Sequence, residues 1–73
     1  MKINAILKNI ENRTYNGYDF ISAKVIFEGT DYPCFITVKT DKDIDSFKLD
    51  STITLDLSIG AYNYKPIYKY KII

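Results

Sequence analysis

Apolar residues occupy every second position in two neighbouring segments, residues 18–27 and 32–39. Successive side chains of a β-strand point to opposite faces, so each segment is predicted to form a strand with one apolar face. That face holds Ile21, Ala23, Val25 and Phe27 in the first segment and Cys34, Ile36 and Val38 in the second. A chain with this pattern has to bury one side of a sheet.

The opposite face of the same two segments combines aromatic rings with cations. Its members are Tyr18, Phe20, Ser22, Lys24, Ile26, Phe35, Thr37 and Lys39. The solvent side of a half-buried sheet is normally polar, whereas rings and cations together suit a single-stranded nucleic acid, because rings stack on bases and cations contact phosphates. The alternative is a second core, covered by another part of the chain or by a partner.

The flanking segments extend this sheet. Alternation of Ile3, Ala5 and Leu7 predicts a first strand, and residues 11–17 break the pattern and end in the turn dipeptide Asn16-Gly17. Residues 28–31 form a second short link. We therefore expect a meander of three antiparallel strands, with residues 11–17 as a loop.

At residues 40–49 the strand-like alternation stops and the pattern predicts a short helix. Thr40 or Asp41 can cap a helix of one or two turns, in which Ile44 and Phe47 recur at a spacing of three. Apolar alternation from Ile53 to Ile59 then predicts a strand, residues 60–66 a loop, and residues 67–73 a last strand. In that last strand we expect Tyr68 and Tyr70 on the core side and Lys69 and Lys71 outward.

These predicted elements place one apolar core inside the sheet. Its expected members are Ile3, Leu7, Ile21, Val25, Ile36, Val38, Ile53, Leu55 and Leu57, with Phe47 covering the base. Cys34 lies in the apolar phase of its strand, so we expect a small buried side chain there and no reactive thiol.

Composition bounds the possible functions. Seventy-three residues, of which 47% are hydrophobic and 26% charged, predict one ordered domain spanning residues 1–73. A single cysteine excludes an internal disulfide and favours a reducing cytoplasm. The amino-terminal segment lacks the apolar run of a signal peptide, and no stretch is long and apolar enough to span a membrane.

Catalytic chemistry is poorly represented in the sequence. Histidine is absent, which removes the usual general base and the commonest metal ligand. The acids of residues 41–45 lack the glycine and the distant glutamate of a calcium loop, and the three glycines stand alone, which excludes a phosphate-binding loop. We expect a binding protein that is not an enzyme and uses neither a cofactor nor a metal.

The order of three strands, a short helix and two strands is similar to that of an OB-fold, a five-stranded Greek-key barrel in which the helix lies between the third and fourth strands. Residues 47–55 resemble the approach to the fourth strand of such barrels, with Asp50-Ser51 where many members have Gly-Asp. The resemblance implies an all-β fold. A small barrel of SH3 type and an α+β sheet with one helix are the competing architectures.

The resemblance also implies where a ligand binds, because OB-fold proteins hold it across the second and third strands, between the first hairpin loop and the loop joining the last two strands. Transferred to this chain, the expected nucleic-acid-binding residues are Arg13, Tyr15, Tyr18, Phe20, Lys24, Phe35, Thr37, Lys39, Tyr62, Tyr64 and Lys65. We expect both loops to be mobile alone and to become ordered on a bound strand.

Two functions remain open. The first is binding of single-stranded DNA, or of RNA, as in the small single-stranded DNA-binding proteins of phages and mobile elements, which the chain resembles. The second is a protein-interaction module that uses the aromatic patch, such as a phage-encoded inhibitor of a host enzyme or a homo-oligomer. The net charge of only +1 favours the second.

Overall fold

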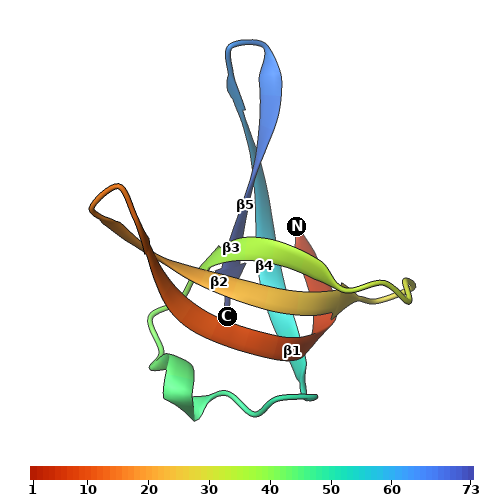
Figure 1. Ribbon diagram of the computed structural model, residues 1–73. Helices are drawn as coiled ribbons and strands as arrows, with labels where there is room; N and C mark the ends of the chain where they lie inside the picture. Colours follow the sequence, from red (N-terminus) through yellow and green to blue (C-terminus); the bar gives the residue numbers. More distant parts are fainter.

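A computed structural model describes all 73 residues, and it contains five strands that close into a barrel in the order β1-β2-β3-β5-β4 (Figure 1). The elements are β1 (Lys2–Tyr15), β2 (Tyr18–Phe27), β3 (Cys34–Lys39), the 3-10 turn η1 (Ile44–Ser46), β4 (Thr52–Tyr62) and β5 (Lys65–Ile72). Neighbouring strands are antiparallel, except that β3 and β5 are parallel. The predicted five-stranded, OB-fold-like barrel is confirmed.

Eight fully apolar side chains fill the barrel. They are Ala5, Leu7, Ala23, Val25, Val38, Ile53, Leu55 and Ile72. Around them pack the half-buried side chains of Ile3, Ile10, Ile21, Phe27, Ile36, Phe47 and Tyr70. The predicted core is therefore confirmed at its centre, and Phe47 packs against it as expected. Leu57 is only half-buried, because β4 leaves the barrel at that point.

Two strand pairs extend beyond the barrel as arms (Figure 1). Residues 13–20 of β1 and β2, the first arm, pair only with each other, and so do residues 58–69 of β4 and β5, the second arm. Residues 11–17 and 60–66 were expected to be loops, and this expectation was wrong. Each is mostly strand and closes through a two-residue turn, Asn16-Gly17 or Asn63-Tyr64.

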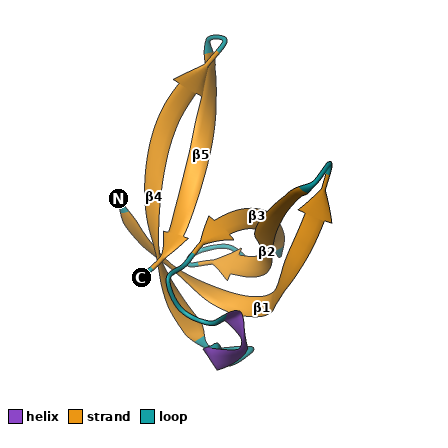
Figure 2. Ribbon diagram, turned by 90° about the vertical axis from the view of Figure 1, so that its left-hand side faces the viewer, coloured by secondary structure: helices purple, strands orange, loops and turns teal.

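The helical segment is shorter than predicted. It is a single 3-10 turn capped by Asp43, whose carboxylate accepts a hydrogen bond from the Asp45 N–H at 3.1 Å. Thr40, an expected cap, instead accepts a hydrogen bond from the Lys42 N–H at 3.1 Å. The turn lies in the connection between β3 and β4, as expected (Figure 2).

Cys34 is exposed, which corrects the prediction of a buried thiol. It lies opposite Val25 in the β2–β3 pair and so shares the inward phase, as its position in the sequence indicated. However, β3 pairs with β5 only through Val38 and Lys39. The barrel wall is therefore open beside the first residues of β3, and an inward-facing side chain there still meets solvent.

The segment before β4 turns at a residue with positive φ. Asp50 has a φ of 64°, in the left-handed region that glycine adopts most readily, and it stands where many OB-fold proteins have glycine. Asp and Asn tolerate this region better than other residues with a side chain.

The structure also holds no helix of the length and apolar character needed to cross a bilayer.

Substitution of Leu55 provides a test of the barrel core. Leu55 is fully buried on β4, so Leu55→Ala should lower the free energy of unfolding by ~2–5 kcal/mol, as measured by urea denaturation. Ile59 on the same strand is 63% exposed, so Ile59→Ala should cost less than ~1 kcal/mol. Equal effects at the two positions would contradict the placement of β4.

Candidate nucleic-acid interface

Strands β1, β2 and β3 present one continuous row of predicted site residues on their outer face. The strand register pairs Tyr15 with Tyr18 and Arg13 with Phe20 across β1 and β2, and Ser22 with Thr37 and Lys24 with Phe35 across β2 and β3. We call these eight residues, together with Glu11 and Lys39 on the same face, the outer strip. Because Ala23 and Val25 point into the barrel, their even-numbered neighbours on β2 must point out.

The outer strip is not a second core of this chain. Phe35 is 69% exposed, and Tyr15 and Tyr18 at the tip of the first arm are also exposed. Phe20 is half-buried. No other segment covers the rings of Tyr15, Tyr18 and Phe35, so for these three the hypothesis of a second core under another part of the chain is wrong.

At the base of the first arm the strip borders a hollow of about 430 Å³. Its lining includes Phe20, Thr37 and Lys39, and the remaining members are Asp19, Ile21, Val38, Thr40, Asp41 and Lys71. The hollow therefore brings a ring, a hydroxyl and a cation from the predicted set into one concave place. Asp41 lies 3.3 Å from the Lys71 ammonium, so one carboxylate and one cation of the rim neutralise each other.

Lys24 and Phe35 form the other end of the strip. The Lys24 ammonium lies 5.8 Å from the centre of the Phe35 ring, within the range of a cation–π contact. This contact holds the exposed ring beside a cation, which is also the composition that a base and its phosphate require. The same pair also stabilises the sheet as a cross-strand contact.

The charges on the strip are only partly free. Arg13 donates from Nε to the Glu11 carboxylate at 2.9 Å and contacts the same oxygen through its guanidinium end. Lys24 and Lys39, by contrast, take part in no ion pair. They are the two cations of the strip that are available to an anionic ligand.

The residues predicted to bind do not include Glu11, because the sequence pattern predicts a loop over residues 11–17. In the strand that the structure shows, Glu11, Arg13 and Tyr15 share one face. The signal was present as a period-two alternation of large polar side chains, but no apolar face accompanied it because this part of β1 leaves the core.

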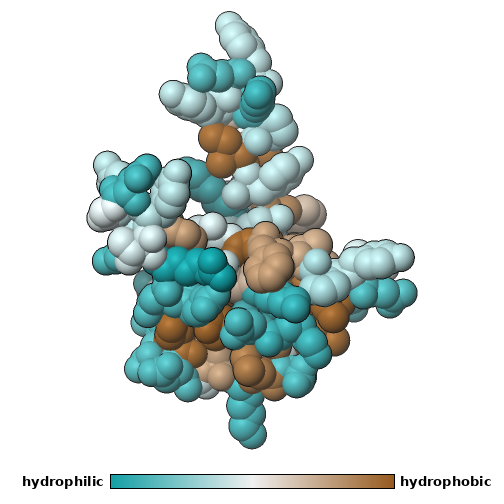
Figure 3. Space-filling view, viewed as in Figure 1, coloured by the Kyte–Doolittle hydropathy of each residue, from teal (hydrophilic) through white to brown (hydrophobic).

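Three predicted site residues lie on the second arm. Tyr62 and Lys65 form its last cross-strand pair, and Tyr64 occupies the turn. Figure 2 shows the two arms leaving the barrel in different directions, and Figure 3 shows hydrophilic groups gathered on both tips. The structure thus forms one site from the outer strip and leaves the tip of the second arm as a separate group of two rings and a cation.

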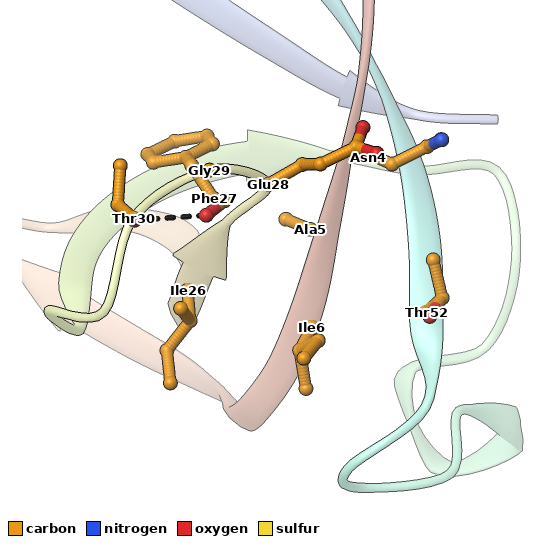
Figure 4. A pocket seen from close by; sticks show the side chains of 9 residues that line it. All are labelled: Asn4, Ala5, Ile6, Ile26, Phe27, Glu28, Gly29, Thr30 and Thr52. Atoms are coloured by element: carbon orange, nitrogen blue, oxygen red, sulfur yellow. Dashed lines mark hydrogen bonds between the residues drawn. The ribbon is translucent and has the colours of Figure 1, made fainter.

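A second hollow, of about 320 Å³, lies between β1, the end of β2 and the start of β4 (Figure 4). Ile6 and Ile26, a cross-strand pair, form its apolar part, and Asn4 and Glu28 its polar part. It contains no cation and no residue of the predicted site. The Glu28 carboxylate is the one charged side chain of its lining and would repel a phosphate, so this hollow does not suit a nucleic acid.

No group of three or more acidic or cysteine side chains is arranged to hold a metal ion. Comparison of the chain with protein-family models, with curated proteins and with solved structures gives no significant match. The case for a function therefore depends on the geometry of the outer strip.

The exposure of Phe35 leads to a prediction about stability. Phe35→Ala should change the free energy of unfolding by less than ~1 kcal/mol, because the ring buries little surface and loses only its contact with Lys24. Urea denaturation of the purified variant measures this change. A loss of more than ~2 kcal/mol would mean that the ring is a structural element of the sheet.

Proposed function

We propose that this protein is a non-enzymatic binder of single-stranded nucleic acid, with DNA as the expected ligand and RNA as the alternative. The observation that carries the proposal is the outer strip, in which exposed rings alternate with the unpaired cations Lys24 and Lys39 on an uncovered face. Base stacking on aromatic side chains is worth ~1–3 kcal/mol per base, so a few such contacts give useful affinity.

The spacing of the strip favours single strands over duplexes. Tyr18 and Phe20 are successive outward positions of β2, which lie about 6.7 Å apart in a strand. Stacked bases in a duplex are about 3.4 Å apart along each strand. Neighbouring bases must therefore separate in order to stack on neighbouring rings, and an unpaired strand separates its bases more easily than a duplex does.

The positive charges that this proposal needs are the free cations of the outer strip, and not the net charge of the protein. The net charge is only +1, so long-range attraction to nucleic acid is weak and the free cations must act at short range. The single cysteine forms no disulfide and suits the reducing cytoplasm in which we place the protein. The order of the elements in this chain is similar to that of small OB-fold DNA-binding proteins, such as those of phages and mobile elements, and is consistent with the same proposal.

A fluorescence-anisotropy titration with labelled oligothymidine at several salt concentrations tests the proposal. We expect binding at low salt that weakens linearly in log affinity against log salt, and weaker binding by Phe20→Ala and Phe35→Ala. Lys24→Ala and Lys39→Ala should each reduce the slope by about 0.7, the value for one phosphate contact in a single strand. Lys48→Ala is the matched control. It removes an exposed cation beside η1, outside the outer strip, and should leave the salt slope unchanged.

The outcome for the wild-type protein decides the proposal. Absence of binding to oligothymidine at low salt would exclude a nucleic-acid ligand. Tighter binding to a duplex of the same length than to the single strand would overturn the stacking mechanism.

The ion pair on the strip gives a prediction of increased affinity. Glu11→Gln removes the carboxylate that holds the Arg13 guanidinium, so Arg13 becomes available to phosphate. We expect tighter binding to oligothymidine and a salt slope steeper by about 0.7. An unchanged slope would mean that Arg13 does not contact the ligand.

One observation favours a protein partner as the second candidate function. The first residues of β3 pair with β2 but not with β5, which leaves an open strand edge next to the exposed Phe35. An open edge accepts an extended peptide through backbone hydrogen bonds. Binding of that kind depends little on salt, so the salt titration separates the two functions.

A further inference from the structure

The two arms end in tight turns of the same kind that differ in one residue. The first turn is Asn16-Gly17, with φ values of 50° and 79°, and the second is Asn63-Tyr64, with φ values of 50° and 62°. Two consecutive residues with positive φ are characteristic of a type I′ hairpin turn, for which Asn-Gly is the preferred sequence. The second turn has the preferred first residue and a tyrosine where glycine is preferred.

Tyrosine is a poor choice for the backbone at this position. A side chain in the left-handed region brings Cβ close to the following carbonyl oxygen, a strain that glycine avoids and that Asn and Asp tolerate best. In the first arm, glycine occupies the equivalent turn position. Strain of this kind at an exposed position is typical of residues that serve a function other than stability.

The surroundings of Tyr64 indicate what that function is. Its side chain is fully exposed, so it contributes nothing to the packing of the arm. Lys65 follows it, Tyr62 faces Lys65 across the hairpin, and neither Lys65 nor Lys69 is in an ion pair. No acidic residue occurs after Asp56. The tip thus offers ring faces beside an uncompensated cation, a combination that fits a base with its phosphate better than a basic or purely apolar partner.

We propose that Tyr64 is a base-stacking anchor, retained at the turn of the second arm in spite of its backbone strain, which extends nucleic-acid contact from the outer strip to this separate arm. The inference rests on the proposed function. A tight turn fixes the backbone that carries the ring, and tyrosine has only two side-chain torsions to order on binding. The anchor is therefore organised before the ligand arrives.

A pair of variants tests the inference by measuring stability and affinity together. Tyr64→Gly should raise Tm by about 4–8 °C, because it creates the preferred turn, and should weaken oligothymidine binding about fivefold or more, because it removes the ring. Tyr64→Phe keeps both the ring and the strain, so Tm and Kd should stay at their wild-type values. Circular dichroism gives Tm, and anisotropy gives Kd.

Two further variants serve as controls. Gly17→Tyr introduces the same strain into the first arm and should lower Tm by a similar amount. Tyr32→Ser removes another strongly exposed tyrosine, 80% accessible, from the link between β2 and β3, and should not change Kd. An equal loss of affinity in Tyr32→Ser would overturn the assignment of the anchor to Tyr64.

The outcomes distinguish this inference from the proposed function. If the wild-type protein binds oligothymidine and Tyr64→Gly binds equally well, the anchor is excluded and the proposed function stands. If Tyr64→Gly binds more weakly but is no more stable than the wild type, the ring is a contact that is not held under strain, and the inference as stated is wrong. If the wild type itself does not bind, the proposed function fails, and the anchor fails with it.

Discussion

The barrel depends on a β-bulge in β1, close to the point where the strand stops pairing with β4 and continues with β2 alone. Residues 2–6 pair with β4 and residues 5–15 with β2, and the register with β2 shifts between Leu7 and Asn9. A bulge bends a strand and increases its twist. The Leu7 N–H donates to the Ser51 carbonyl at 2.9 Å, and the Asp50 N–H donates to the Leu7 carbonyl at 2.7 Å. Lys8, at the bulge, contacts the Asp50 carboxylate, so the segment leading into β4 is fastened to the point where β1 turns away.

Prediction from the sequence succeeded wherever a strand faces the core. Alternation along β2 gave its bounds and both of its faces, because Ala23 and Val25 are buried and their neighbours are not. Prediction failed where strands leave the core. Residues 11–15 have no apolar face, so the alternation of their large polar side chains was not recognised as a strand. Cys34 was given the correct face and the wrong burial, since burial there depends on the short contact between β3 and β5, which the sequence pattern does not encode.

In the candidate site too, some features follow from strand phase and others depend on which strands and turns meet. The outward direction of Phe20, Lys24 and Phe35 followed from strand phase alone, whereas the pairing of Lys24 with Phe35 is known only from the register in the structure. The Glu11–Arg13 ion pair and the Lys71–Asp41 pair depend on which strands and turns meet, and both change how much positive charge a ligand encounters. A nearly neutral chain can thus carry a cationic strip, but the number of free cations becomes known only once the register is known.

The double role of β1 has a consequence for how the chain folds. The β1–β2–β3 meander uses local contacts, whereas the β1–β4 pairs join distant parts of the sequence, such as Ile3 and Leu55. Distant contacts form slowly because a long loop must close first. Until β4 arrives, residues 2–6 form an unpaired strand edge with Ile3 and Ala5 uncovered, and such edges are where folding intermediates aggregate. Residues 2–6 of β1, which pair with β4 in the native barrel, are therefore the part of the folding intermediate most prone to aggregation.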